Sequence, residues 1–457
     1  MRKVSIRTLD EFLRNTKQEP KTIETTKATL SSLTVKITGF YKETDFKQTP
    51  IGKIPKQWDI TKLQKVSLKI KAGGTPKVSI KEYWNGGIPF VKIEDITSAS
   101  KYLNCTKTTI SKLGLKNSSA WIIPKNSLLL AMYGSMGEVA INKIEVATNQ
   151  AILGIIPSEK TYVEYLYYWF QYFKPQWQKY AKLTTQPNLT AQIVRNAHIP
   201  LPSLAEQWGV AEVLSSVDRA IEKTEELIGR LERLRKALMQ ELLTKGIGHK
   251  EYKQTPIGKI PIEWNIVKLG SIFIFKNGKR PEIVKEKGVV PIYGAGFLQG
   301  YTNKPMINLE NVIIIARVGK GSAGKVYLAS GKMWISDNAI YAVPNNNRKV
   351  YSPFYYYYLQ YLRLDKIAVR SAAGGYSLIT QSSLSNLYVP LPPINEQQII
   401  YNILNSIDNW ITLEFKRKEK LEKLKRGLMN LLLTGRVRVK VEVVNASNTR
   451  SLVKDTR

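Results

Sequence analysis

Few residues of the chain combine the types and spacing that chemistry requires, and one glycine-rich segment is the strongest candidate. Residues 319–325 read GKGSAGK after the apolar run VIIIARV, which is close to the phosphate-binding loop G-x-x-x-x-G-K-[ST]. Val326 stands where the magnesium-binding Ser or Thr belongs, and VYLAS after Lys325 is typical of a strand, whereas that loop must open a helix. We therefore expect a glycine-rich hairpin tip, with a P-loop NTPase at Gly319–Lys325 as a disfavoured alternative.

Metal, redox and acid–base sites find little support. Cys105 is the single cysteine, which excludes a disulfide framework and a cysteine-based zinc site. His198 lies in NAHIPLP and its counterpart in the second half of the chain is Tyr388, so we interpret it as a structural residue. The pair Glu94–Asp95 has no accompanying nuclease pattern. These residues indicate recognition rather than catalysis.

The charge of the chain points to a polyanion. Its 457 residues contain 69 Lys and Arg against 36 Asp and Glu, a formal charge of +33. Nucleic acid is the expected partner, and an anionic membrane surface is a distant second. The N-terminus lacks the apolar region of a secretory signal, and no apolar run approaches the roughly 20 residues of a membrane span. We expect a soluble, cytoplasmic protein.

Internal repetition sets the architecture. KQTPIGKIP occurs at residues 47–55 and again at 253–261, and IPLPSLAEQ from Ile199 corresponds to VPLPPINEQ from Val389. LERLRKALMQELLT from Leu231 likewise corresponds to LEKLKRGLMNLLLT from Leu421. The edges of the two copies agree while their interiors diverge, which is typical of a tandem duplication. This pattern predicts two different recognition tasks on one shared frame.

Each copy ends in a long helix. Apolar residues recur every three or four positions, including Leu234, so each segment of about 39 residues predicts a rod of roughly 60 Å. Matching stripes favour antiparallel packing of the two helices, less tightly at Thr224 and at Glu414–Lys418, where the stripe is interrupted. The positions expected to pack are Val210, Leu214, Val217, Ile221, Leu231, Leu238, Ile400, Leu404, Ile407, Ile411, Leu421 and Leu428.

The divergent interiors have mixed strand and helix signals, with strands expected around residues 121–157 and 306–343. The aromatic runs at residues 164–173 and 352–362 predict helices buried against the sheets, with stacking on single-stranded bases as the alternative. RVRVKVEVV from Arg436 alternates like a strand. The expected fold class is α/β (α+β): two mixed α/β domains joined by an antiparallel coiled coil, with pseudo-two-fold symmetry.

Several motifs together resemble the DNA-specificity (S) subunit of a type I restriction–modification system. They are IGKIPKQWDITKL, then KAGGTPK and EYWNGGIPFVKIEDI, then IPLPSLAEQ before a long helix ending in LLTKG. The second copy has IGKIPIEWNIVKL, VPLPPINEQ and LLLTG. The resemblance covers about Phe46 to Gly435; GGTP becomes GKRP at residues 278–281, and residues 1–45 match no motif.

The resemblance implies a division into target-recognition domains and helical regions. Domain 1 spans residues 1–203, helical region 1 spans 204–248, domain 2 spans 249–393, helical region 2 spans 394–435, and 436–457 form a basic tail. Each domain would read half of a bipartite site in double-stranded DNA, with the helices setting the gap. Two methyltransferase (M) subunits would bring S-adenosylmethionine, and restriction (R) subunits ATP and Mg²⁺. The chain itself would have no active site, cofactor or metal.

Residues that could contact DNA are mostly polar or basic and lie at matched loop positions of the two domains. They are Lys71, Thr75, Lys77, Lys92, Tyr133, Ser135, Met136, Gln186, Asn188, Lys276, Lys279, Arg280, Tyr293, Arg317, Lys320, Ser322, Lys325 and Tyr376. Two other protein classes stay open at this point. A stand-alone DNA-binding regulator would share the charge and the repetition, whereas a coiled-coil scaffold would show little salt-dependent DNA binding.

Overall fold

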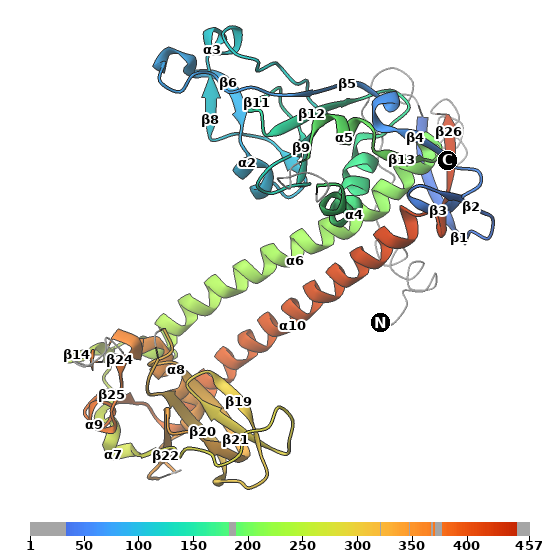
Figure 1. The fold of residues 1–457 in the computed structure, drawn as a ribbon. Helices are drawn as coiled ribbons and strands as arrows, with labels where there is room; N and C mark the ends of the chain where they lie inside the picture. The colour runs from blue at the N-terminus through green and yellow to red at the C-terminus, as the bar shows by residue number, and fades with distance from the viewer. Residues whose placement is uncertain are drawn as a thin grey trace, which may run out of the picture. The chain divides into compact units, whose positions relative to one another are not determined.

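The computed structural model describes residues 33–181, 189–319, 321–346, 348–366, 369–370 and 377–445 (Figure 1). The chain forms two compact units. Unit 1 holds the described residues up to Lys223 and from Lys418, and unit 2 holds those from Thr224 to Arg417. The long helices α6 (Leu204–Lys245) and α10 (Ile394–Leu432) each contribute to both units. The domain limits expected from the sequence therefore stay a prediction. None of the helices among the described residues could span a membrane.

Unit 1 contains a five-stranded sheet in the order β5 (Ser67–Ala72), β12 (Ile152–Pro157), β9 (Leu128–Ala131), β10 (Val139–Asn142), β7 (Tyr102–Leu103). A second sheet has the order β11 (Ala147–Thr148), β6 (Trp84–Val91), β8 (Thr108–Ile110). The short helices η2 (Lys81–Tyr83), α2 (Ile93–Ser98) and α3 (Lys112–Lys116) lie between these strands in the chain. Strands β9 and β10 are buried along their whole length, in keeping with their apolar sequences up to the buried Asn142 at the end of β10.

Unit 2 contains a six-stranded sheet in the order β17 (Phe273–Asn277), β22 (Ala339–Pro344), β20 (Ile307–Ala316), β21 (Val326–Ile335), β18 (Val290–Gly294), β19 (Phe297–Thr302). Helix α8 (Ser352–Leu362) packs its aromatic residues into the same core as this sheet. The short elements η3 (Leu364–Lys366), β23 (Val369–Arg370) and β24 (Ser377–Leu378) follow it. The strands predicted in both divergent interiors are thus confirmed.

The aromatic runs form buried helices, as the repeat predicted. In α4 (Val163–Ala181), Tyr165 and Tyr168 are fully buried and share a core with Leu128 and Leu153 of the sheet. The Tyr165 hydroxyl donates to the Pro200 carbonyl at 3.0 Å. In unit 2, the hydroxyl of the corresponding Tyr355 donates to the Pro390 carbonyl at the same distance. These rings are structural and unavailable for stacking on bases.

Both units carry the same set of frame elements. The hairpin β2 (Phe46–Thr49) and β3 (Gly52–Pro55) corresponds to β14 (Tyr252–Thr255) and β15 (Gly258–Pro261). The pair β4 (Asp59–Lys62) and β13 (His198–Leu201) corresponds to β16 (Asn265–Lys268) and β25 (Tyr388–Leu391). The short helices η1 (Leu63–Val66) and α5 (Ala191–Arg195) correspond to α7 (Leu269–Ile272) and α9 (Gln381–Ser385). His198 pairs with Lys62 as Tyr388 pairs with Lys268, in keeping with a structural position.

The two ends of the described chain pair with each other in unit 1. Strand β1 (Leu33–Lys42) runs antiparallel to β26 (Val437–Asn445). The strand predicted from the alternation after Arg436 is confirmed. Val437 and Val439 pack into the core of unit 1, so β26 belongs to the folded unit instead of forming a basic tail.

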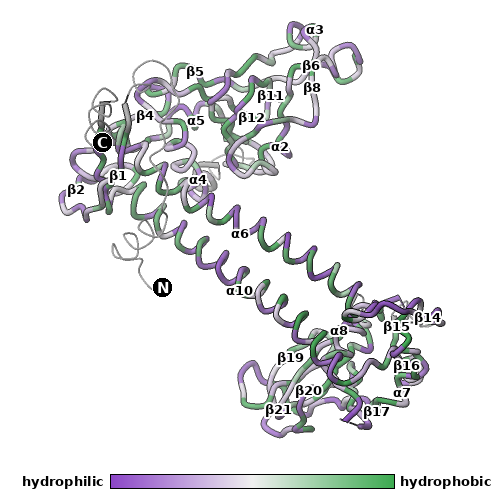
Figure 2. Tube along the Cα trace, turned by 180° about the vertical axis from the view of Figure 1, so that it is seen from behind, coloured by the Kyte–Doolittle hydropathy of each residue, from purple (hydrophilic) through white to green (hydrophobic). Residues whose placement is uncertain are grey.

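The long helices contact each other inside each unit, and Figure 2 shows the mixed hydropathy along both. In unit 1, Val210 and Leu214 of α6 share a core with Leu428 and Leu432 of α10. In unit 2, Met239 of α6 shares a core with residues at the start of α10. Of the predicted packing positions, seven are buried: Val210, Leu214, Val217, Leu231, Ile400, Leu404 and Leu428. The others are half-buried: Ile221, Leu238, Ile407, Ile411 and Leu421.

One expectation about the stripe is wrong. Leu234 is 44% exposed, because the inward face passes from Leu231 through the half-buried Arg235 to Met239, a spacing of four residues. The looser packing expected at Thr224 and at Glu414–Lys418 stays a prediction. Thr224 and Glu414 are themselves buried, whereas Phe415 is 49% exposed.

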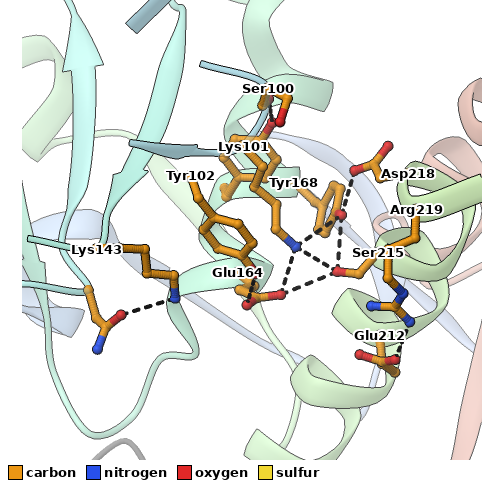
Figure 3. A network of polar contacts seen from close by, with 12 residues as sticks. Ser100, Lys101, Tyr102, Lys143, Glu164, Tyr168, Glu212, Ser215, Asp218 and Arg219 are labelled. Carbon is orange, nitrogen blue, oxygen red and sulfur yellow. Dashed lines mark hydrogen bonds and ion pairs between the residues drawn. The ribbon is translucent and has the colours of Figure 1, made fainter. Parts of the chain in front are cut away.

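A buried polar network joins the strands of unit 1 to both α4 and α6 (Figure 3). Lys101 is 6% exposed, and its Nζ lies 2.9 Å from Glu164 Oε2 on α4 and 2.8 Å from Ser215 Oγ on α6. The Tyr168 hydroxyl donates to Asp218 Oδ2 at 2.6 Å. Loss of one partner would leave another buried polar group unsatisfied. The network therefore holds the segment around Lys101 and the helix α4 against α6.

Candidate nucleic-acid interface

In unit 1, three strand ends meet at the turn Asn149–Ala151. The amide of Gly74, after β5, donates to the Thr148 carbonyl at 2.9 Å. The amide of Met132, after β9, donates to the Ala151 carbonyl at 2.8 Å. Strand β6 runs parallel to β11, so its end also reaches this turn. The loops that follow these strands are therefore gathered at one place.

Unit 2 builds the same junction at the turn Ser336–Asn338. The amides of Lys279 and Arg317, after β17 and β20, donate to the carbonyls of Ile335 and Asn338 at 2.8 and 2.9 Å. Strand β18 runs parallel to the end of β21, and the Ser336 amide donates to the Tyr293 carbonyl at 2.8 Å. The two turns are thus equivalent in their strand connections.

A glycine follows the first strand of each junction, and it allows the backbone there to lie close against the central turn. A Cβ atom on Gly73 would lie 2.0 Å from the Thr148 carbonyl oxygen, and one on Gly278 would lie 2.1 Å from that of Ser336. Any side chain would therefore push the loop off the turn. The degraded GKRP copy retains the glycine that this geometry requires.

The two central turns were not predicted from the sequence. They read TNQAI at residues 148–152 and SDNAI at 336–340, which is a match at a spacing of 188 residues. This match could have indicated the turns, but it is much shorter than the other repeated blocks. The match places Gln150 and Asn338 at equivalent positions. In unit 1, the Thr75 hydroxyl donates to Gln150 Oε1 at 2.5 Å.

The sequence-predicted residues of unit 1 flank its turn. Six follow the strand ends or lie at them and are exposed or half-buried: Lys71, Thr75, Lys77, Lys92, Tyr133 and Ser135. Met136 packs partly against the hydrophobic core. Lys71 was expected in a loop but lies in β5, where it pairs with Gly154.

Thr75, Lys92 and Asn149 also line a cavity of about 470 Å³ in unit 1. Trp84 and Phe90 form its aromatic part, with ring centroids 5.5 Å apart in an edge-to-face arrangement. The cavity therefore combines an aromatic wall with an amide and a cation beside the turn.

The predicted residues of unit 2 occupy matching places. Lys279 and Arg280 are exposed after β17, and Arg317 and Ser322 are half-buried after β20. Tyr293 is the second-last residue of β18, and burial raises the pKa of its hydroxyl. Lys276 was expected in a loop but lies in β17 opposite Tyr341. Gln186, Asn188, Lys320 and Tyr376 lie outside the described residues.

The glycine-rich segment joins two antiparallel strands. β20 ends at Ala316 and β21 begins at Val326, and the Ala316 amide donates to the Lys325 carbonyl at 2.8 Å. No helix follows Lys325, so its amides cannot form the phosphate cradle of a P-loop. Lys325 instead lines a cavity of about 570 Å³ with Arg235 and Lys236 of α6.

Both junctions offer the chemistry of duplex recognition. Gln and Asn side chains can form paired hydrogen bonds with a base edge, and Arg and Lys can bind guanine edges or phosphates. Unit 1 presents the exposed Gln150 with Lys71 and Lys77, while unit 2 presents Arg280 beside the half-buried Asn338, whose Oδ1 accepts from the Ala295 amide. The two turns share a framework and differ in side chains, as different target sequences would require.

Residues 55–233 and 261–423 match the family described as type I restriction modification DNA specificity domain. A specificity subunit of the type I enzyme MjaX from Methanocaldococcus jannaschii, described as putative, is 32% identical over 88% of this chain and 98% of its own length. The MjaVIII specificity subunit of the same organism is 29% identical over the same shares. This chain belongs to the type I DNA-specificity subunits. Its function is the recognition of a DNA sequence.

Solved structures of this specificity-subunit family share the fold. The S subunit of a type I restriction–modification system from M. genitalium is 20% identical, and superposes with a TM-score of 0.56 over 82% of this chain and 96% of its own. A chain from a type I restriction–modification assembly is 18% identical, with a TM-score of 0.51 over 84% of this chain and 99% of its own. At these identities the agreement concerns the fold of the specificity subunit.

Proposed function

We propose that this specificity subunit reads a bipartite DNA target, with one half-site for each unit. The observation that carries the proposal is the pair of equivalent turns, Asn149–Ala151 and Ser336–Asn338, each gathering three strand ends. A shared framework with different side chains can hold two reading surfaces for two different sequences. Direct readout at each turn would use its amide side chain and the neighbouring cations.

The helices α6 and α10 would form an antiparallel coiled coil that sets the gap between half-sites. In unit 1, Lys425 Nζ of α10 lies 2.7 Å from Asp218 Oδ1 of α6. In unit 2, the guanidinium of Arg235 of α6 binds the carboxylate of Asp408 of α10. Asp408 comes 190 residues after Asp218, and Arg235 comes 190 residues before Lys425. Such reciprocal contacts are what a pseudo-two-fold pair of helices would make.

The partners in this proposal are methyltransferase subunits, two per chain, and restriction subunits. The partners would contribute S-adenosylmethionine, ATP and Mg²⁺, while this chain contributes sequence recognition and no active site. A rod of roughly 60 Å spans fewer than two turns of B-DNA, so the half-sites would lie about one turn apart.

Selection from a randomised duplex pool tests the proposal, with the full chain and the subunits that co-purify with it. A single two-part motif with a fixed gap is the expected result. One continuous motif would instead favour a stand-alone regulator. The absence of any enriched motif, despite a co-purified methyltransferase, would contradict the proposal.

A further inference from the structure

The tip of the β18–β19 hairpin carries an aromatic residue in a backbone conformation that aromatic residues rarely adopt. Phe297 has φ +71° and is 37% exposed. The preceding residue, Gly296, could take such a conformation without strain, but the chain places it on Phe297. A bulky residue held in the left-handed region and left partly exposed suggests a functional demand on its ring.

The Phe297 ring is held by two other aromatic rings. Its centroid lies 4.8 Å from that of Tyr293, with an interplanar angle of 25°, and 4.8 Å from that of Tyr327, at 30°. Tyr293 lies in β18 and Tyr327 lies in β21, so strands of the sheet hold both neighbouring rings. A ring fixed in this way loses little side-chain entropy when a ligand binds.

Hydrogen bonds tie the tip to the central turn of unit 2. The Ala295 amide donates to Asn338 Oδ1 at 2.9 Å, and the Tyr327 hydroxyl donates to the Ala295 carbonyl at 3.1 Å. The Ser336 amide donates to the carbonyl of Tyr293, whose ring stacks on Phe297. The aromatic tip is therefore part of the junction that the proposed function assigns to DNA.

We propose that Phe297 is a specificity-determining residue that contacts the 5-methyl group of a thymine in the half-site of unit 2. This inference rests on the proposed function and deepens it. In the major groove, thymine is marked by its 5-methyl group, and phenylalanine is among the side chains that recognise it by apolar contact. The neighbouring Lys279, Arg280 and Arg317 supply the cations that bind the surrounding phosphates or guanines.

The contact is particular to unit 2. At the equivalent place in unit 1, strand β6 ends at Val91, and Lys92 and the helix α2 follow instead of a hairpin tip. The two half-sites should therefore differ in their demand for thymine. The half-site read by unit 1 serves as an internal control in the same complex.

Thymine-to-uracil substitution tests the contact, because it removes only the methyl group. Binding of the full complex is measured on the selected duplex, with each thymine of both half-sites replaced in turn. One replacement in the unit 2 half-site should weaken wild-type binding about three- to tenfold, as expected for one apolar methyl contact. Phe297→Ala should weaken binding to the thymine duplex by a similar factor. The same variant should bind the uracil duplex no more weakly than the thymine duplex, because both changes remove the same contact.

Two further variants separate recognition from folding. Phe297→Gly removes the ring while relieving the left-handed backbone, so it should lose the thymine preference and unfold at a higher temperature than Phe297→Ala. Leu309→Ala truncates another exposed apolar residue of unit 2, at the opposite end of β20, and should leave both binding and thymine preference unchanged.

Three results would overturn the inference while leaving the proposed function intact. They are a unit 2 half-site without thymine, equal sensitivity to uracil in wild type and Phe297→Ala, and an equal loss on target and scrambled duplexes. Failure of the wild-type complex to select a two-part motif would instead refute the proposed function itself. Phe297 acting as a wedge between base pairs would appear as unstacking of a 2-aminopurine probe with no uracil effect, which also counts against the methyl contact.

Discussion

Arg438 and Glu206 form a buried ion pair although 232 residues separate them in the chain. Arg438 Nε lies 2.5 Å from Glu206 Oε1, and its Nη2 lies 2.8 Å from Oε2. The indole of Trp58 donates to the same carboxylate at 3.1 Å. The start of α6, the hairpin region of unit 1 and the strand β26 are thereby joined at one carboxylate. In unit 2 Glu396 has the same place, where it binds Trp264 and His249.

Arg438→Ala should therefore destabilise the chain strongly. The Glu206 side chain is 6% exposed, and its carboxylate would lose its buried counter-charge, which costs about 3–5 kcal/mol. Chemical unfolding measures the loss. Lys42→Ala is the control, because Lys42 is an exposed lysine of the paired strand β1 and should change stability by less than about 0.5 kcal/mol. Equal stability of the two variants would contradict the role of the ion pair.

Glu164 predicts a loss of stability in acid. Burial alone would raise the pKa of its carboxyl group, but the Lys101 ammonium and the hydrogen bonds from Tyr102 and Lys101 hold it below 4.5. A carboxyl group whose pKa is lower in the folded state stabilises the fold above its unfolded pKa, and loses that contribution as the pH falls through the folded value. Stability should therefore decrease below about pH 4.5.

Glu164→Gln should flatten this part of the acid dependence, since an amide does not titrate. Unfolding measured by urea between pH 3 and pH 7 would reveal the difference between the variant and the wild type. Glu159→Gln is the matched control, because Glu159 is an exposed glutamate just before α4. An acid slope of Glu164→Gln equal to that of the wild type would show that another group dominates.

The sequence predicts the frame well and the junctions poorly, for physical reasons. Long identical blocks such as KQTPIGKIP mark hairpins whose backbone must be the same in both units, so the repeat identifies them directly. The central turns require a glycine packed against them, a small residue and an amide side chain. Several sequences can meet these requirements, so TNQAI and SDNAI share few residues. Residues such as Arg438 are harder still, since alternation predicts a strand but gives no sign that a charged side chain meets a buried Glu206.

Arg280→Ala should relax recognition of one half-site only. Arg280 is exposed in the loop after β17, beside the turn Ser336–Asn338. Loss of a bidentate contact to guanine should cost about 1–3 kcal/mol at one base position, while a phosphate contact would weaken all sequences alike. Selection from a randomised pool distinguishes the two. Lys77→Ala is the matching change in unit 1, and it should affect the other half-site.

Lys332→Ala is the control for charge in unit 2. Lys332 is exposed in β21 and pairs with Asn308, at the end of β20 away from the turn. It removes the same charge as Arg280→Ala and should leave both half-sites unchanged. If Arg280→Ala weakened both half-sites equally, Arg280 would be a non-specific contact and its assignment to one half-site would be wrong.

Lengthening both long helices by one heptad should widen the gap without changing either half-site. Insertions after Lys223 in α6 and after Arg417 in α10 fall between the two units. Both members of the ion pair Asp218–Lys425 stay in unit 1, and both members of Asp408–Arg235 stay in unit 2, so the insertions separate neither pair. Seven residues add about 10.5 Å and two turns, so the apolar stripe keeps its face and the gap should grow by about three base pairs.

A heptad in α6 alone is the control for this experiment. It would move one helix against the other, so the contacts of unit 1 and unit 2 could no longer form together, and the variant should lose stability and selective binding. The doubly extended variant should bind a target whose half-sites are those of the wild type and whose gap alone is longer. An unchanged gap in that variant would mean that the helices do not set the spacing, and the gap would then have to be set by the partner subunits or by the DNA.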